Sequence, residues 1–177
     1  MKFLPVAEVF ESIESKSKRL EMMDLLADTF TQADLSETAE LAYLLQGKLG
    51  PDFAGINVGM GDKFVAQSIA KVSGFSITDV TARYKKLGDL GLVAQVVLEK
   101  RKQKAFFSAP LELAKVFDNL LRIARASGTG SQEQKIRLLA ELLNSAKPVE
   151  AKFLVRIPLE QLRLGLGDST IMDALAL

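Results

Sequence analysis

Apolar residues recur at three- and four-residue spacing along most of the chain, which is the pattern of amphipathic helices. The first such stripe consists of Phe3, Val6, Phe10 and Ile13. A second, with Leu20, Met23, Leu26 and Phe30, follows the polar residues at 15–17. No segment shows the sustained alternation or the β-branched run of a strand. The pattern predicts an all-α fold of about ten helices.

Glycine, proline and capping residues divide this pattern into separate helices. Ser76–Asp79 looks like a capping box that opens a helix ending at Leu87. Gly88–Gly91 is predicted to break the chain before a helix over Leu92–Lys100. A longer connection is expected over Lys100–Lys104 and Phe106–Pro110.

Two stretches of the chain repeat each other, Asn57–Ala70 and Arg163–Ala176. Upstream of them, Lys18–Leu49 aligns with Ser131–Leu162 without a gap, and one insertion, Gly50–Ile56, restores the register. The matched residues of the two turns are Gly59, Gly61, Asp62 and Ala70 with Gly165, Gly167, Asp168 and Ala176.

The repeat predicts one helical domain over 1–177 that contains two half-domains related by a pseudo-two-fold axis. The half-domains cover about 1–74 and 111–177, and 75–110 connects them. A strongly amphipathic helix over Leu113–Ala124 is expected to bridge them.

Each repeated turn has the pattern Gly-x-Gly-Asp and leads into a helix. Glycine allows a positive φ and leaves room for a ligand beside the backbone. The first N–H groups of the following helix have no internal partner, and the helix dipole favours an anion there, phosphate above all. Two such turns related by a pseudo-dyad would suit a nucleic-acid duplex, because its antiparallel strands are themselves related by local dyads. The alternative is that the turns are tight helix connections, with Asp62 and Asp168 as N-caps.

A third glycine turn spans Ser127–Gln132. A nucleotide-binding loop would need a preceding β-strand and a Gly-Lys-Ser/Thr ending, and both are missing. The turn is either a flexible joint with Ser131 as N-cap or a phosphate site formed by Gly130–Gln132, with Lys135 one turn further on. Its counterpart in the first half is Ser15–Lys18.

Composition narrows the chemistry further. The chain has no cysteine and no histidine, which excludes disulfides, thiolate chemistry, zinc sites and imidazole bases. We find no catalytic constellation and predict no metal site. The net charge of +1 means that nucleic-acid binding must come from a focused surface and from backbone amides.

The chain shows neither a secretory nor a membrane-spanning pattern. We therefore expect no membrane partner and a cytoplasmic protein, nucleoid-associated in a prokaryote or nuclear in a eukaryote.

Four landmarks in order resemble one known domain: Tyr43–Gly61, Gly88–Ala94, Ser127–Lys135 and Glu150–Ala176. The chain resembles the N-terminal DNA-binding domain of ATP-dependent DNA ligases of the archaeal and eukaryotic type. The resemblance implies a helical domain with internal pseudo-two-fold symmetry that grips nicked duplex DNA across the minor groove, in replication, repair and recombination.

The same resemblance implies partners. Adenylation and oligonucleotide-binding domains of the parent chain complete a ring around the DNA, and a sliding clamp is a further candidate. The catalytic lysine of that family lies in a Lys-x-Asp-Gly motif, which does not occur here. We therefore expect no cofactor in this chain, with ATP and Mg2+ used by the absent catalytic domains, and a ligase fragment that binds DNA without sealing a nick.

The candidate DNA-binding residues come from the glycine turns and the helix starts. Arg163 is the best single cation for the minor groove or a phosphate, and an ion pair with a neighbouring helix is its alternative. Met60, Leu164 and Leu166 are candidates for contact with sugars in a widened minor groove, and core packing is their alternative. The full set is Lys16, Ser17, Lys18, Gly59, Met60, Gly61, Lys63, Gly128, Thr129, Gly130, Ser131, Gln132, Lys135, Arg163, Leu164, Gly165, Leu166 and Gly167.

Two other functions fit the pattern less specifically. One is a free-standing helix-hairpin-helix-like module that binds nucleic acid, for which a stop codon after Leu177 would argue. The other is a helical scaffold for a protein partner. Salt separates the scaffold from the DNA-binding functions, because only phosphate binding weakens steeply as salt rises.

Overall fold

The computed structural model describes residues 1–101 and 108–177. Within these residues the chain forms ten α-helices, a 3-10 turn (η1, Asp52–Ala54) and no strand beyond a single bridge between Lys2 and Glu112. The predicted all-α class is confirmed. The expected connection over Lys100–Lys104 and Phe106–Pro110 falls outside the described residues at 102–107. The helices are α1 (Phe3–Glu14), α2 (Arg19–Phe30), α3 (Leu35–Leu45), α4 (Asp62–Ser73), α5 (Ile77–Leu87), α6 (Leu90–Glu99), α7 (Leu113–Arg125), α8 (Ser131–Ser145), α9 (Pro148–Arg156) and α10 (Asp168–Ala176).

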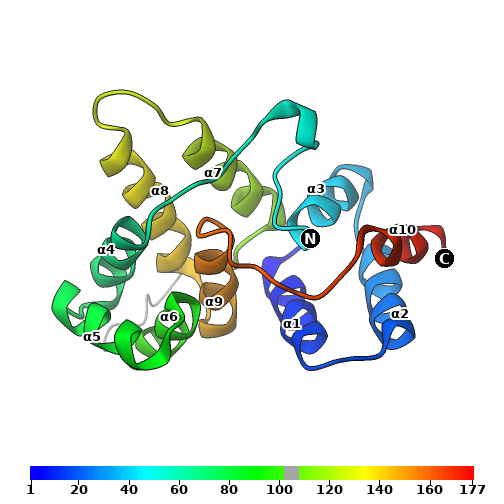
Figure 1. Ribbon diagram of the computed structural model, residues 1–177, viewed down its shortest axis with the longest axis horizontal. Coiled ribbons are helices and arrows are strands. Elements are labelled where there is room, and N and C mark those ends of the chain that lie inside the picture. Colours follow the sequence, from blue (N-terminus) through cyan, green and yellow to red (C-terminus); the bar gives the residue numbers. More distant parts are fainter. Residues whose placement is uncertain (102–107) are drawn as a thin grey trace.

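The helices lie in two groups, and the packing crosses the chain order (Figure 1). Helix α4 follows α3 in the sequence but packs on α8, while α10 follows α9 but packs on α2. Helix α7 packs against both α8 and α3. The first and second sequence halves therefore exchange their last helices, so each group contains elements of both.

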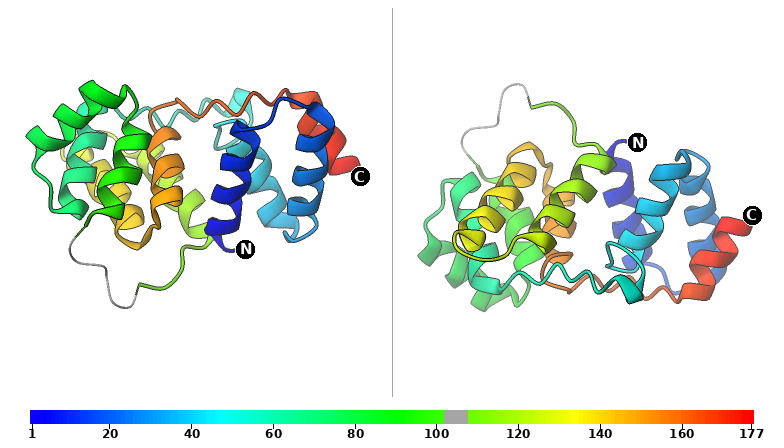
Figure 2. Two further views of the ribbon diagram at one scale, coloured as in Figure 1. Left: turned by 90° about the horizontal axis from the view of Figure 1, so that it is seen from below. Right: turned by 90° about the horizontal axis from the view of Figure 1, so that it is seen from above.

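Two long connections carry this exchange in opposite directions. One runs from α3 to α4 and the other from α9 to α10, and both lie along one long edge of the molecule (Figure 2). They meet where the N–H of Met60 donates to the carbonyl of Pro158 at 3.0 Å. The glycine turns at the ends of the connections consequently lie along the same edge.

The first apolar stripe is buried as expected, whereas the second is buried only over its C-terminal part. Phe3 and Ile13 are fully buried on α1. On α2, Leu26 and Phe30 are buried as predicted, but Leu20 is 71% exposed and Met22 is buried instead. The face of α2 that packs is the one directed at α1 and α10, and the spacing of Leu20 and Met23 alone did not identify it.

Helix α6 begins earlier than the sequence predicts. Asp89 accepts a hydrogen bond from the N–H of Leu92 and caps the helix, so Gly91 lies inside it rather than in a break. A Cβ at Gly91 would approach the carbonyl oxygen of Lys152 to 2.7 Å. Glycine is therefore present at this position because α6 and α9 pack almost backbone to backbone.

A cluster of charged side chains joins α1, α6 and α9. Arg156 is 9% exposed, pairs with Glu14 and donates from Nη2 to Asp89 at 2.8 Å. Lys152 pairs with Glu14 at 2.8 Å. Burial tends to raise the pKa of Asp89, but the Arg156 guanidinium outweighs it and holds this pKa below its ordinary value. Because the folded pKa is depressed, this contribution to stability is present at neutral pH and is lost as the pH falls.

Candidate nucleic-acid interface

The two repeated glycine turns have similar backbone geometry. Gly59 and Gly165 both have positive φ, 39° and 69°, a conformation that L side chains rarely adopt. Gly61 and Gly167 are both extended, with φ/ψ of −70°/154° and −83°/154°. The sequence repeat thus corresponds to a repeat of conformation. The N-caps are Gly61 and Gly167 themselves, one residue before the aspartates considered for that role.

The helices that follow the predicted turns begin without a side-chain cap. No side chain caps α2, α4, α8 or α10, whereas Asp34, Ser76 and Asp89 cap α3, α5 and α6. On α8 the N-cap is Gly130, so the expected capping role of Ser131 is corrected.

Several N–H groups at these helix starts are left without an acceptor. Among the described residues none is found for the N–H of Lys63, Gln132 or Ser169, each within the first two residues of its helix. Such groups carry the positive end of the helix dipole. All four helices that the sequence proposed as anion sites are uncapped. Helices α1, α7 and α9 also lack a side-chain cap, but the first N–H groups of α1 and α7 donate to backbone carbonyls and α9 begins with Pro148, which has no N–H.

The crossed packing gathers the candidate residues into two clusters. The α4–α8 cluster consists of Gly61, Lys63 and Gln67 with Gly128–Gln132. All of these except Gly61 line a hollow of about 550 Å³, which Phe64, Glu133 and Ile136 also line. The sequence placed Lys63 and the third glycine turn in different halves; the fold brings them together. Ser68 fixes the helix pair by donating to the carbonyl of Ile136 at 3.1 Å.

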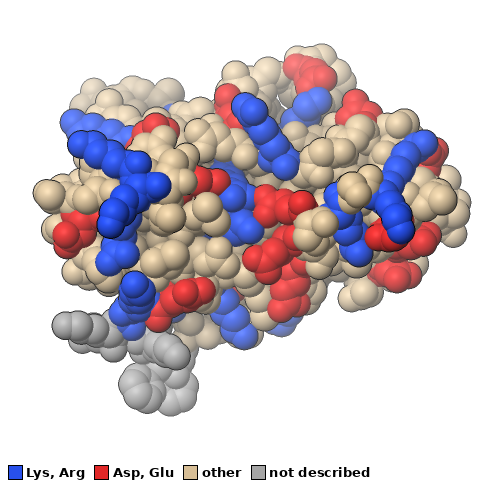
Figure 3. Space-filling model, turned by 60° about the horizontal axis from the view of Figure 1, so that its bottom comes forward, with Lys and Arg blue, Asp and Glu red and all other residues tan. Residues whose placement is uncertain are grey.

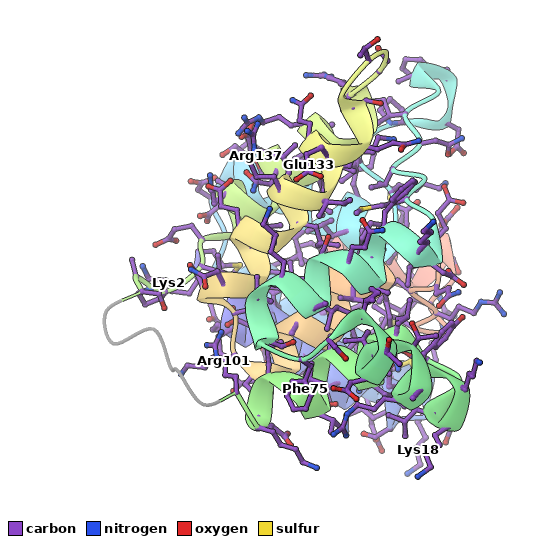
Figure 4. All side chains as sticks on the ribbon, turned by 90° about the vertical axis from the view of Figure 1, so that its left-hand side faces the viewer. Lys2, Lys18, Phe75, Arg101, Glu133 and Arg137 are labelled. Atoms are coloured by element: carbon purple, nitrogen blue, oxygen red, sulfur yellow. The ribbon has the colours of Figure 1, made fainter. Side chains whose placement is uncertain are left out.

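The α2–α10 cluster consists of Lys16–Arg19 with Gly167–Thr170 and Asp173. Arg19 joins the two helices, because its Nε donates to Thr170 Oγ1 at 3.1 Å and its guanidinium pairs with Asp173. Each cluster thus combines a helix start from one sequence half with a glycine turn from the other. In the view of Figure 4, Lys18 lies on the side of the two connections, while Lys2 and Arg101 lie on the opposite side.

The candidate cations differ in their partners. Lys16 and Lys18 both pair with Glu21. Within the described residues Lys63, Lys135 and Arg163 form no salt bridge, so the alternative of an ion pair for Arg163 is not observed. Arg163 is exposed on the second connection, just before Gly165.

Two apolar candidates are corrected by their burial. Met60 and Leu164 are only 3% and 5% exposed and belong to the hydrophobic core. The N–H of Met60 is also occupied, because it donates to Pro158. Neither side chain is presented to a sugar, since each anchors its connection to the core. Leu166 is half-buried and packs at the edge of the same core.

The surface charge is mixed rather than uniformly basic. Figure 3 shows lysine and arginine gathered toward the end of the molecule that holds α5, and acidic side chains near the middle. Lys85 and Lys86 in the last turn of α5 contribute to that basic end. The face shown in Figure 3 therefore carries separate cations among acidic side chains rather than one broad basic surface.

The chain matches a known protein family along almost its whole length. The family described as DNA ligase N terminus matches residues 2–176. The chain belongs to this DNA ligase family. A DNA ligase from Nitrosopumilus maritimus is 40% identical over all 177 residues, and one from Acidianus ambivalens is 41% identical over 186 aligned residues covering the whole chain. A relative named DNA ligase 2, from Korarchaeum cryptofilum, is 38% identical over 99% of the chain.

The chain spans about three-tenths of the length of these curated ligases, 30% of the Nitrosopumilus protein and 31% of the Acidianus protein. The match therefore concerns the part of a ligase that the family description calls the N terminus. None of the helices in the described part of this ligase domain is long and apolar enough to cross a bilayer.

Sequence reasoning missed three contributors to the clusters, namely Arg19, Gln67 and Asp173. The candidates were taken from the glycine turns and from residues beside the predicted helix starts, and these three residues were not among them. The repeat itself contains the missing signal: its two alignments place Arg19 opposite Gln132 and Asp173 opposite Gln67. Positions that are equivalent in a repeat but differ in chemistry mark where two similar sites diverge.

Proposed function

We propose that this domain holds duplex DNA at a nick, without sequence preference, as the DNA-binding part of a DNA ligase. One observation supports the proposal above the others: the uncapped helix starts of α2, α4, α8 and α10 form two related clusters beside the same long edge. Open amides at helix starts bind phosphate oxygens.

The arrangement suits a duplex better than a single anion. The two strands of DNA are related by local dyads, so two clusters related by a pseudo-dyad can each meet one backbone. Amides, hydroxyls and a few cations such as Lys63 and Arg163 contact phosphates and sugars, which fix position without reading bases. Sequence-independent binding is what the sealing of nicks at any position requires.

Sealing itself belongs to other parts of a ligase in this proposal. The chain spans about three-tenths of the ligases it matches and contains no Lys-x-Asp-Gly motif. Adenylation and oligonucleotide-binding domains would supply that chemistry, with ATP and Mg2+ bound there. The contribution of this domain is to hold both sides of the break in register.

The domain alone should form no covalent adenylate. With no histidine, no cysteine and no Lys-x-Asp-Gly motif, it has no nucleophile placed for AMP transfer. The measurement is incubation with labelled ATP and magnesium, followed by denaturing electrophoresis, with an intact ligase as positive control. A labelled adduct on this polypeptide would contradict the proposal that adenylation takes place in another domain.

Binding should tolerate any sequence and weaken with salt. A small number of neutralised phosphates fits the net charge of +1, so the slope of log affinity against log salt should be roughly −3 to −6 by the counterion rule. Nicked duplexes of unrelated sequence should bind equally, and single strands more weakly. Fluorescence anisotropy over a salt series measures all three. Salt-independent affinity would instead support a protein-binding scaffold.

A further inference from the structure

The two clusters differ where their helices meet, although repeated sequence builds both. In the α2–α10 cluster, Arg19 donates to Thr170 and pairs with Asp173, which joins the two helices. At the equivalent positions of the α4–α8 cluster stand Gln132 and Gln67, which line the open hollow of about 550 Å³. One cluster is therefore closed by an ion pair between its helices. The other is open, and its hollow is lined by the two amide side chains together with Glu133, which pairs with Lys71.

A second difference lies on the connections. Only the first contains the insertion Gly50–Ile56, which forms the turn η1 and carries Phe53 with 93% of its surface exposed. Lys48 Nζ pairs with Asp52 at 2.8 Å, and Gly55 ends the turn in the left-handed conformation. These interactions give the turn a defined conformation. The second connection has no equivalent aromatic residue.

We propose that these differences make the interface directional, so that a nicked duplex is bound in one of its two orientations. This inference rests on the proposed function. An intact duplex bound without sequence preference looks the same after rotation about a local dyad. A nick removes that dyad, because only one strand carries the 3′-hydroxyl and the 5′-phosphate. Two unequal clusters then bind the two orientations with unequal free energy.

The chemistry of the clusters supports unequal contacts with the two strands. In the α4–α8 cluster the hollow gives a phosphate access to the open N–H groups of α4 and α8, with two amide side chains as additional donors. In the α2–α10 cluster Asp173 places a carboxylate at the equivalent point, and Arg19 is already engaged. Phe53 adds an apolar contact beside one end of the interface only.

Orientation can be measured by energy transfer, since the chain has no cysteine and one introduced thiol labels a single site. Gln32→Cys at the end of α2 and Lys86→Cys on α5 place a donor in either helix group, both at exposed positions. The acceptor is attached to one end or the other of a short nicked duplex. The intact duplex of the same sequence is the control, and both of its ends should give equal transfer.

We expect the nicked duplex to give unequal transfer for its two ends, in opposite order for the two donor positions. The preference should be about tenfold or more, which corresponds to about 1.4 kcal/mol. The double variant Arg19→Gln with Asp173→Gln should reduce the preference at least threefold by making the clusters alike. Both side chains are more than half exposed, so the variant should keep its melting temperature.

The reciprocal variant, Gln67→Asp with Gln132→Arg, should close the hollow and also reduce the preference. Equal transfer for both ends of the nicked duplex in the unmodified domain would overturn the inference while leaving DNA binding intact. A preference that both double variants retain unchanged would overturn it as well. Absence of binding to any duplex would instead contradict the proposed function.

Discussion

Alanine at Gly61 or Gly167 should weaken binding to nicked duplex about ten- to hundredfold while barely changing stability. Both glycines have negative φ, −70° and −83°, which alanine adopts readily. The new Cβ at Gly61 would meet nothing within 4 Å, and that at Gly167 only Ser169 Oγ at 3.8 Å. The protein therefore has room for the methyl group, but a phosphate approaching the helix start does not. Each lost charge-assisted contact costs about 1.5–3 kcal/mol.

Two small effects on stability should nearly cancel at these positions. Alanine restricts the unfolded chain, which stabilises the fold by about 0.4–1 kcal/mol. Alanine is also a poorer N-cap than glycine, by an amount of similar size. The measurement is affinity by anisotropy beside thermal melting for each variant. If both variants bind like the parent, the glycine turns are structural joints and the interface lies elsewhere.

Positions with positive φ require a matched control, because strain alone lowers stability there. Gly165 and Gly74 have φ of 69° and 77°, and a Cβ meets nothing within 4 Å at either. Gly74 is the C-cap of α4 and lies outside the glycine turns, whereas Gly165 belongs to the second repeated turn. Gly165→Ala should therefore lose affinity that Gly74→Ala retains, at comparable losses of melting temperature.

Gly91→Ala should destabilise the fold by about 1–3 kcal/mol, near the upper end of that range. Its Cβ would lie 2.7 Å from the carbonyl oxygen of Lys152 and 2.8 Å from Cγ of Arg156. The first of these is backbone of α9, so α6 and α9 must separate. That separation also loosens the Arg156 pairs with Asp89 and Glu14. The gain in helix propensity, about 1 kcal/mol, opposes the effect but is smaller.

In a protein of this size the expected fall in melting temperature for Gly91→Ala is about 4–10 °C. Gly50→Ala is a suitable control, because its Cβ would meet only the end of the Ile56 side chain, at 3.1 Å. That side chain can move, so the control should melt close to the parent. A Gly91→Ala variant that melts at or above the parent would show that α6 and α9 tolerate separation.

The helices and the repeat could be predicted because their causes are local. Period and capping residues define helices such as α1 and α5, and the positive φ of Gly59 and Gly165 restricts those positions largely to glycine. The predicted start of α6 was wrong because the reason for glycine at this position lies in a distant part of the chain. Glycine at position 91 indicated a break, but it is required by contact with α9, which is more than fifty residues away in the chain.

The sequence predicted the residues of the candidate site better than it predicted how they come together. The sequence supplied most members of both clusters. It grouped them by sequence half, however, because segments adjacent in the chain were assumed to pack together. The exchange of α4 and α10 depends on which apolar faces fit each other, and a single sequence does not encode that pairing in any local pattern. Met60 and Leu164 were misplaced for the same reason, since a residue in a connection can still reach the core.

The central claim is that open amides at the helix starts bind the phosphates of DNA, and amide chemical shifts test it most directly. On addition of nicked duplex, the N–H signals of Lys63, Gln132 and Ser169 should move strongly. The N–H signals of Glu37 and Asp79 should stay in place, because the side chains of Asp34 and Ser76 already accept from them. Shifts concentrated at those capped helix starts, with none at the glycine turns, would contradict the account.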